Sequence, residues 1–592
     1  MMKSKTASKQ NQKDKKPLVD KPKVRGSRPE ADNKYWLYLS GILFLTAIVF
    51  FPILKNGFTN WDDPTYITNN PLIKGLSASN IKRIFSEVYF ANYQPLHILS
   101  YCIEYHFFKM NPAGYHTVSL IMHLINVILV FFFVRKLSDN NIIALATCLL
   151  FAINPLRTES VAWVAERKDL LYSMFFFAAL IFYMNYIKGA ENDVRENQKL
   201  QTKYLIYAFL FFVLSVFSKA MAVSLVPVLF LLDFYVGRKF GLRSVLEKIP
   251  FLILAIIMGL VSVNASKEEG SIDTSTNYSF IDRLIFACHN LLQYIIKSVV
   301  PYNQSAYYQY PEKVSGSLPV QYYVAGLIAI ALAVFAFYSL KKGKQFFFAI
   351  TFFVVTVFLV LMIIPVGPTI FSERYSYIPS VGLFFLLVSY AYNFVAIKPE
   401  IKTIALILLG IVSCTYAYLT YERCKVWKDS ITLWSDAVKQ FPKAPHALNN
   451  RGDAYFQAGQ FEPALVDFTE AIKANNTYAQ AYYNRGNAYG QMGKAKEAFA
   501  DLNVAIKLDS KNADAYNKRG QANGVLGNFD AAINDFNTAL QLKPALTEVY
   551  FNLGITYLNA NRKDLACINL KKAVDEGFEN AIKPYNEMCG RK

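Results

Sequence analysis

Two carboxylates stand side by side directly after the first long apolar segment of the chain. They are Asp62 and Asp63, in the sequence NGFTNWDDP that begins at Asn56. Neighbouring carboxylates repel each other, which raises the pKa of one of them unless a cation lies nearby. A carboxylate at the mouth of a cavity could take the proton from an acceptor hydroxyl, as a general base does. An Asp-Pro pair also begins turns, and the dipeptide alone leaves both interpretations open.

A second segment concentrates six formal charges between two apolar stretches. Residues 154–169 read NPLRTESVAWVAERKD. Ionisable groups beside membrane spans are costly to bury and are therefore functional candidates. Arg167 and Lys168 could hold a phosphate, which arginine can bind through two parallel hydrogen bonds. The alternative is an interfacial helix whose charged ends reach the water.

Two further charged groups fit the same arrangement. Lys219 interrupts the otherwise nearly apolar residues 204–236, and the pair Glu373 and Arg374 precedes a late apolar segment. We therefore expect carboxylates and basic residues from four separate loops to meet at one membrane face. Such a cluster suits an enzyme that handles a lipid phosphate with an outward-facing head group, and it is unexpected in a simple anchor.

Histidine and cysteine patterns do not predict a metal site. Four of the six histidines, His97, His106, His116 and His123, lie close together in the sequence, but their spacing fits no compact ligand motif. The seven cysteines contain no CxxC pair, which disfavours structural zinc and a disulfide framework. We expect no resident metal or cofactor, although a divalent cation is compatible with the chemistry.

The elements that must position these residues are apolar helices. The chain has 592 residues, of which 54% are hydrophobic and 18% charged, whereas soluble domains have about 25% charged residues. This composition excludes a soluble enzyme and a disordered protein. A helix crosses a bilayer with about 20 residues. Eleven candidate spans are 35–54, 117–134, 141–154, 170–187, 204–217, 221–236, 249–263, 320–340, 346–366, 380–397 and 403–420.

The distribution of charge predicts the orientation. Residues 1–34 carry a net charge of +7 and are expected to be a disordered cytoplasmic tail. With the N-terminus inside, every inner loop is basic, as the positive-inside bias requires. Residues 284–300 could also span, but the basic run 341–344 would then lie outside, so we expect an outer-face or re-entrant helix there. The charged loops and the C-terminal region then face the periplasm or the ER lumen.

The C-terminal region repeats every 34 residues. Glycine recurs at this interval from Gly452 to Gly554, and alanine recurs in the same register. A 34-residue period with small residues where two helices meet is the tetratricopeptide pattern, a solenoid whose concave surface binds proteins. A half repeat around Trp434 follows the last span directly, which predicts a rigid junction with the membrane region.

Three arginines recur at one position of these repeats. They could line a groove that attracts an anionic acceptor protein, or they could be solvated or salt-bridged. These residues are Arg451, Arg485 and Arg519.

The order of the motifs resembles one known family. The segments NGFTNWDD, NYQPLHILSY, NPAGYHTVSLIMHLINVIL, FAINPLRTESVAWVAERKDLLYSMFFFAAL, SKAMAVSLVPVLFLLDF and ERYSYIPSVG, followed by the repeats, are similar to those of the transmembrane and tetratricopeptide-repeat O-mannosyltransferases. That family belongs to the membrane-embedded glycosyltransferases of the GT-C type. The resemblance covers nearly everything from residue 55 to the C-terminus.

The resemblance implies an activity and a role for each candidate residue. The donor would be a polyprenyl-phosphate sugar such as dolichyl-phosphate mannose, and the sugar would pass with inversion to a Ser or Thr hydroxyl of an acceptor protein on the outer face. The implied catalytic carboxylates are Asp62, Asp63 and Glu159. The implied ligands of the donor phosphate are Arg167, Lys168, Lys219 and Arg374. The implied supporting residues are Asp169, Glu373 and His97.

The chain departs from the family pattern in two motifs. Where the family usually has His-Pro…His-Thr-Glu, this chain has Asn154, Pro155, Arg157, Thr158 and Glu159. Where the family usually has Ser-Lys-Glu, this chain has Ala220 in the third position. Two imidazoles and one carboxylate are therefore missing, which leaves a metal-dependent scheme and the identity of the sugar open.

The expected architecture is all-α. A GT-C-like membrane bundle (35–420) would be followed by a tetratricopeptide solenoid (421–592), with a half repeat at 421–444, four repeats at 445–580 and a C-terminal helix. The favoured function is a membrane glycosyltransferase whose repeats recruit the acceptor. The alternative is a non-catalytic membrane scaffold, and a transporter is a weaker third option because no inverted repeat is visible.

Overall fold

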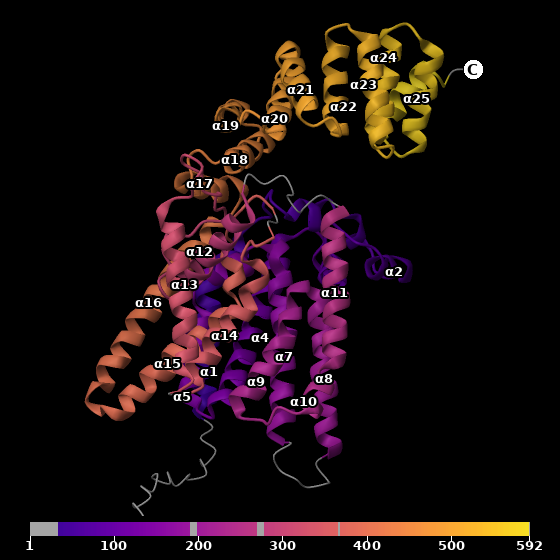
Figure 1. Cartoon of the computed structure of the whole chain (residues 1–592). Coiled ribbons are helices and arrows are strands. Elements are labelled where there is room, and N and C mark those ends of the chain that lie inside the picture. The colour runs from indigo at the N-terminus through magenta and orange to yellow at the C-terminus, as the bar shows by residue number, and fades with distance from the viewer. Residues whose placement is uncertain (1–33, 190–197, 269–277, 342, 365–366, 591–592) are drawn as a thin grey trace, which may run out of the picture.

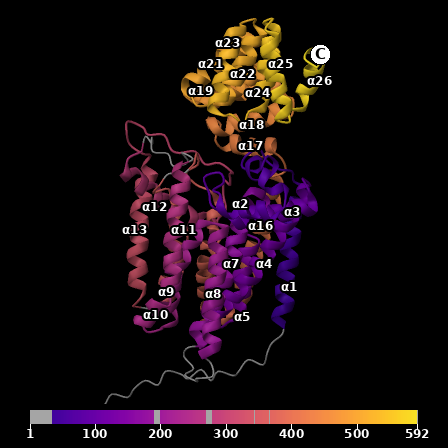
Figure 2. The same ribbon diagram turned by 90° about the vertical axis from the view of Figure 1, so that its right-hand side faces the viewer.

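The molecule consists of a bundle of long helices and a curved array of shorter helices above one of its ends (Figures 1 and 2). The computed structural model describes residues 34–189, 198–268, 278–341, 343–364 and 367–590. Across these ranges the β pairing is limited to two isolated bridges. The predicted fold class, an apolar helical bundle followed by tetratricopeptide repeats, is confirmed. The predicted basic tail lies almost entirely outside the described residues.

The bundle is built from helices of unequal length. Its short helices are α2 (Ala78–Ser86), α3 (Pro95–Phe108), α6 (Thr158–Ala162) and α10 (Leu242–Leu246). Its other helices are α1 (Lys34–Phe50), α4 (Pro112–Ser138), α5 (Asn141–Ala152), α7 (Arg167–Gly189), α8 (Gln198–Ser218), α9 (Leu225–Val236), α11 (Ile249–Glu268), α12 (Phe280–Val299), α13 (Val320–Ser339), α14 (Gln345–Val357), α15 (Pro379–Ile397) and α16 (Lys402–Val426).

The expected count of eleven spans is not confirmed. Within the described residues, eight helices are long and apolar enough to cross a membrane, and a bent pair formed by Asn141–Ala152 and Pro155–Ala162 would make nine. The two other expected spans correspond to the shorter apolar helices Ala220–Val236 and Gln345–Val360. A helix rises about 1.5 Å per residue, so such segments do not by themselves reach across a bilayer core of about 30 Å.

Helix α12 differs from these spans because polar side chains recur along its buried face. Asn290 is 1% exposed and Lys297 4% exposed. Its first turn has a capping box in which Ser279 and Asp282 bond each other's backbone N–H. It is not among the candidate spans, in keeping with the expectation that residues 284–300 do not cross the membrane.

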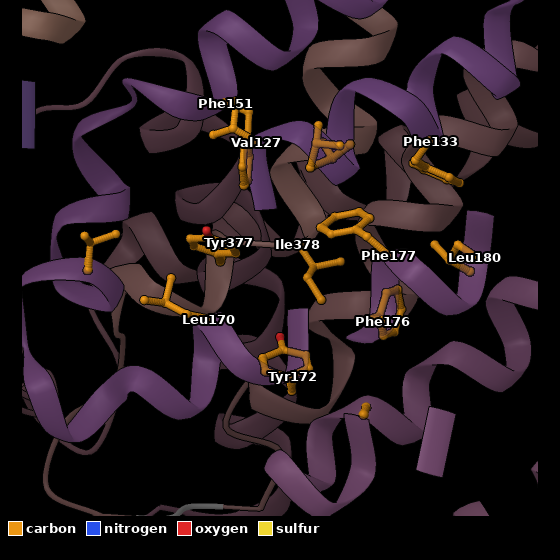
Figure 3. Packing of buried hydrophobic residues seen from close by; sticks show 14 of the residues in the cluster. Val127, Phe133, Phe151, Leu170, Tyr172, Phe176, Phe177, Leu180, Tyr377 and Ile378 are labelled. Atoms are coloured by element: carbon orange, nitrogen blue, oxygen red, sulfur yellow. The ribbon is translucent and has the colours of Figure 1, made fainter. Parts of the chain in front are cut away.

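The core of the bundle surrounds α7. Aromatic and aliphatic side chains of α7, such as Phe176, Phe177 and Leu180, pack against Phe133 of α4 and Ile378 at the start of α15 (Figure 3). Helices α4 and α8 both pack along α7. Because α7 is enclosed almost throughout, its first turn, which carries the charged motif, is held rigidly at one end of the bundle.

The array contains paired helices in the predicted register. Its helices are α17 (Ser430–Gln440), α18 (Pro445–Gln457), α19 (Phe461–Ala474), α20 (Ala479–Gln491), α21 (Ala495–Leu508), α22 (Ala513–Val525), α23 (Phe529–Leu542), α24 (Thr547–Asn559), α25 (Lys563–Asp575) and α26 (Ile582–Met588). A Cβ atom at Gly452 would lie 2.7 Å from the ring of Phe468. The repeating glycine therefore permits the close approach of the two helices in a pair.

The three repeating arginines each form a salt bridge within the array. Each guanidinium binds a carboxylate sixteen residues further along, on the second helix of its own repeat, through two hydrogen bonds of 2.6–3.0 Å. The pairs are Arg451 with Asp467, Arg485 with Asp501, and Arg519 with Asp535. The structure therefore shows the salt-bridge alternative for all three arginines.

A disulfide joins the last two helices of the array. Cys567 of α25 is bonded to Cys589, which follows α26. The cysteine spacing gave no sign of this bridge, because the two residues are 22 positions apart and belong to no short motif. The cysteine pattern disfavours a disulfide framework and does not predict this single bridge; the other five cysteines are free.

Candidate active site

A cavity of about 350 Å³ lies beside the junction of the bundle and the array. Its described walls come from the first loop after α1, the segment leading into α7, the turn between α8 and α9, the end of α11 and the segment before α15. Four of the predicted site residues line it, namely Asp62, Lys168, Lys219 and Arg374. The convergence of charges from four loops is therefore present in the structure.

Glu166 occupies the centre of this charged group. Its side chain is 1% exposed, and Oε1 lies 3.0 Å from Nζ of Lys168. Its other oxygen lies 3.6 Å from Nζ of Lys219 and 3.3 Å from Nε of Arg374. One buried carboxylate thus holds three cations near the cavity. Two of these cations have a second carboxylate partner, since Lys219 also pairs with Asp169 and Arg374 with Glu159, so their charges are compensated by the protein.

Asp62 is the carboxylate of the first loop that faces the cavity. Burial raises the pKa of Asp62 above its usual value, and the charge of Lys168 opposes that rise. A general base works best when its pKa approaches the operating pH. Both the position and the electrostatics of Asp62 therefore suit proton abstraction from a hydroxyl in the cavity.

Asp63 points into the protein instead. Its Oδ2 accepts hydrogen bonds from the backbone N–H and the hydroxyl of Thr59 at 2.7 and 3.1 Å, and Oδ1 accepts one from the N–H of Ala165 at 2.9 Å. Burial raises the pKa of Asp63 to about 7. Asp63 ties the first loop to the segment before α7, so of the two expected bases the geometry selects Asp62.

Glu159 acts on the cavity through Arg374. It is 2% exposed, accepts a hydrogen bond from the backbone N–H of Arg374 at 3.1 Å and forms an ion pair with the guanidinium. The guanidinium lies over the rings of Trp163 and Tyr375, with centroid distances of 5.2 and 4.8 Å. Glu159 does not line the cavity. Its structural role is to orient Arg374, so the catalytic role expected for Glu159 is not supported by its position.

Arg167 is the predicted phosphate ligand that the structure places elsewhere. Its guanidinium is fully buried, forms an ion pair with Glu104 and donates to the carbonyl of Tyr115 at 2.7 Å. A hydroxyl, that of Ser119, lies at 3.3 Å. With these partners and no exposure to the cavity, Arg167 braces α7 against α3 and α4. On α7, successive side chains point about 100° apart, so Lys168 reaches the cavity and Arg167 does not.

The three predicted supporting residues lie close behind the cavity wall. Asp169 accepts a hydrogen bond from Nζ of Lys219 at 2.5 Å. The ring Nε2 of His97 lies 2.7 Å from the hydroxyl of Tyr101, and burial lowers the pKa of His97 well below its usual value. Glu373 accepts a hydrogen bond from the hydroxyl of Tyr308 at 2.5 Å and faces away from the cavity.

Tryptophans connect the cavity to the array. Trp61 and Trp163 line the cavity and stack at a centroid distance of 4.7 Å. Trp61 also contacts Trp434 of α17 at 4.7 Å, and Trp163 stacks on Trp427 at 5.4 Å. Asn60, next to Trp61, accepts a hydrogen bond from the indole N–H of Trp434 at 2.8 Å. The wall of the candidate active site therefore rests directly on the first helix of the array.

The sequence analysis missed Glu166 and the tryptophan wall. Glu166 lies inside the charged motif at 154–169, and nothing in the local sequence distinguishes it from the other charged residues of that motif. Four of the five tryptophans belong to the stack. In the sequence, these four tryptophans lie close to the charged motifs and the half repeat, which could have marked them as site residues. That they stack on one another is visible only in the fold.

The arrangement can stabilise a leaving phosphate and deprotonate a nucleophile. Three cations in a partly buried cavity are suited to the negative charge of a phosphate. Aromatic faces such as those of Trp61 and Tyr66 are suited to a sugar ring. In the part of the chain that the structure describes, no group of three His, Cys, Asp or Glu side chains could hold a metal ion.

The comparisons with known proteins agree with these observations. A family model described as dolichyl-phosphate-mannose-protein mannosyltransferase matches residues 104–266, and tetratricopeptide-repeat models match 452–493, 486–524, 525–560 and 547–576. The mannosyltransferase match includes Glu166, Lys168 and Lys219 but neither Asp62 nor Arg374.

Named relatives cover most of the chain. A protein O-mannosyl-transferase of Caenorhabditis elegans is 24% identical over 74% of this chain and 63% of its own length. Human protein O-mannosyl-transferase TMTC3 is 25% identical over 64% of this chain and 44% of its own length. This chain thus spans less than two thirds of either relative. Among solved structures, MamA is 27% identical over 26% of this chain and 88% of its own, with a TM-score of 0.24. The resemblance that the motifs predict is confirmed, and the chain is related to the transmembrane and tetratricopeptide-repeat O-mannosyltransferases.

Proposed function

We propose that this chain is an integral-membrane glycosyltransferase that transfers a hexose, in the first place mannose, from a polyprenyl-phosphate donor to a Ser or Thr hydroxyl of a protein acceptor. The observation that carries the proposal is the cavity that Asp62 lines together with Lys168, Lys219 and Arg374. The named relatives support the reaction class.

The proposed reaction needs only these side chains. The acceptor oxygen attacks the anomeric carbon as the bond between that carbon and the phosphate oxygen breaks. The proton of the hydroxyl passes to the carboxylate of Asp62. The three cations stabilise the charge that develops on the leaving lipid phosphate. Attack from the face opposite the phosphate inverts the configuration.

The outer face is the proposed location of the reaction. The basic inner loops favour a cytoplasmic N-terminus. The bond between Cys567 and Cys589 supports the same placement for the repeats, because disulfides persist in oxidising compartments such as the periplasm and the ER lumen. The repeats would then recruit the acceptor on the side where the cavity opens.

The test is a transfer assay with the purified full chain, dolichyl-phosphate mannose and peptides that contain threonine. Asp62→Asn is expected to reduce kcat about 100-fold or more, the usual contribution of a general base. Glu87→Gln, which changes an exposed carboxylate of the same outer loop, is the matched control and should keep full activity. Undiminished transfer by Asp62→Asn would refute the proposed base.

The non-catalytic scaffold remains the second candidate. It is favoured by the repeats alone and requires no charge in the cavity. Neutralising Lys168, Lys219 and Arg374 would leave a scaffold functional in cells, whereas it would abolish transfer by an enzyme. Mass spectrometry of outer-face glycoproteins from cells with and without this gene distinguishes the two.

A further inference from the structure

A second, larger cavity lies beside the first half repeat and is not part of the charged site. We call it the junction cavity; its volume is about 490 Å³. Its walls are the buried face of α12, residues 302–309, the start of α13, Ile370 with Phe371, and the end of α17 at Gln440 and Phe441. It is therefore enclosed jointly by the membrane bundle and the repeat array.

One short segment separates the two cavities. Gly367, Pro368 and Thr369 line the candidate active site, and the next two residues line the junction cavity. Tyr308 fixes this segment, because its backbone N–H donates to the hydroxyl of Thr369 at 3.0 Å and its carbonyl accepts from the N–H of Ile370 at 3.0 Å. A chain crossing this segment would pass from one cavity to the other.

The side chains of the junction cavity are mostly neutral hydrogen-bonding groups and aromatic rings. Amides come from Asn290, Gln293, Gln309 and Gln321, and rings from tyrosines and phenylalanines. The cavity's lysine, Lys297, already donates to the carbonyls of Tyr302 and Asn303 at 2.7 and 3.1 Å. No Asp or Glu is found among its described lining residues.

The amides of this cavity differ in how much of each is accessible. Asn290 is 1% exposed, and its Nδ2 donates to the carbonyl of Ile370 at 2.8 Å, which fixes the orientation of the amide. Gln309 and Gln321 are more exposed than Asn290, so their amides are the groups that can bond a molecule in the cavity.

We propose that the junction cavity binds the acceptor polypeptide beside the residue that receives the sugar. The proposal rests on the proposed function. Side-chain amides match the alternating N–H and C=O groups of an extended chain, and the rings match its apolar side chains. A phosphate is less favoured here because the described lining has a single cation, Lys297, whereas three line the candidate active site. The position of the cavity against the repeat array favours a polypeptide over a sugar. The array that recruits the acceptor forms one wall.

The test uses the full chain in lipid nanodiscs with dolichyl-phosphate mannose and a library of short peptides, each with one threonine and uncharged flanking residues. The variant combines Gln293→Ala, Gln309→Ala and Gln321→Ala, all of which are at least partly exposed. The loss of these hydrogen bonds is expected to raise the KM for the peptides about 10-fold. The kcat and the hydrolysis of the donor without peptide should stay within about 2-fold. The control is Gln345→Ala, at the start of α14 and outside the cavity.

Each outcome decides between the alternatives. An unchanged KM in the triple variant would overturn the proposal, and a change confined to peptides that already carry a sugar would assign the cavity to carbohydrate instead.

If the unmodified chain transfers nothing, the proposed function fails, and peptide binding is measured separately by cross-linking. The photoreactive residue p-benzoylphenylalanine in place of Gln293 should then cross-link the peptides, and in place of Ile296, on the exposed face of α12, it should not. Equal labelling at both positions would refute the subsite.

Discussion

The first half repeat and the later repeats have the same helical design but different surroundings. Trp434 of α17 packs on Trp61, which lines the candidate active site, and Asn60 donates to the carbonyl of Asn450 and to Asp453 of α18 at 3.0 and 2.9 Å. In the third full repeat, by contrast, Phe536 belongs to a core made of residues of the array. The beginning of the array therefore supports the wall of the site, whereas the later repeats pack on one another.

The strongest test of this difference is a pair of deletions. Deletion of 427–592 removes Trp434 and the partners of Asn60, so we expect donor turnover to fall about 100-fold or more, as for a lost catalytic group. Deletion of 510–592 keeps these contacts and should leave peptide-independent donor hydrolysis within about 3-fold, since repeats interact mainly with their neighbours. Size-exclusion chromatography checks that both proteins are folded. Equal losses of hydrolysis would show that the junction has no special role.

Single substitutions make the same comparison at finer scale. Trp434→Ala is expected to lower kcat about 10-fold by letting Trp61 move, because a displacement of about 1 Å can cost a large part of the rate. Trp434→Phe should restore most of it. Phe536→Ala costs the distal repeats about 3–5 kcal/mol of stability but should not change donor hydrolysis. The measurements are steady-state kinetics and thermal unfolding. A loss of donor hydrolysis in Phe536→Ala would contradict the view that only the first half repeat supports the site.

The pH profile separates the catalytic region from the repeats. A general base acts in its ionised form, so activity falls as the pH drops through its pKa. Because burial raises the pKa of Asp62, the acid limb of kcat/KM should lie above the pKa of about 3.9 for an exposed aspartate. The chain lacking 510–592 should give the same limb. An acid limb of kcat/KM at the pKa of an exposed aspartate would contradict the assignment of Asp62 as the general base. A pH profile that shifts when residues 510–592 are removed would contradict it as well.

The smallest expected effect concerns the repeating arginines. Arg485→Gln breaks a partly exposed, bidentate pair with Asp501, which should lower the stability of the repeats by about 1–2 kcal/mol. Transfer to a short peptide should be unchanged, because the pair lies outside both cavities. Differential scanning calorimetry together with the peptide assay measures both quantities. A selective rise in KM for protein acceptors without any loss of stability would support the acceptor-binding role.

Periodicity accounts for the parts of the fold that the sequence predicts best. The 34-residue repeat places glycine where the helices touch, as at Gly452 and Phe468. Long apolar runs predict the membrane helices, but the count of spans depends on segments of 10–17 residues such as Ala220–Val236 and Gln345–Val360. Their length does not by itself decide whether they cross.

The candidate site is less predictable because neighbouring residues point in different directions. Asp62 and Asp63 are adjacent, yet one faces the cavity and the other accepts three hydrogen bonds from the protein. Arg167 and Lys168 are adjacent as well, and only Lys168 reaches the cavity. The motif identifies the group, and the local backbone direction decides which member of each pair is available for chemistry.

The sequence by itself determined the class of the molecule: an apolar helical bundle, charged loops between its helices, a solenoid with a fixed period, and a resemblance carried by long ordered motifs. Those features depend on residue type and spacing along one chain. Tertiary structure alone decided that Glu166 gathers three cations, that Glu159 serves Arg374, and that Trp434 supports the cavity from a position 373 residues beyond Trp61. Such contacts join distant segments, and their formation depends on the packing of whole helices rather than on any local pattern.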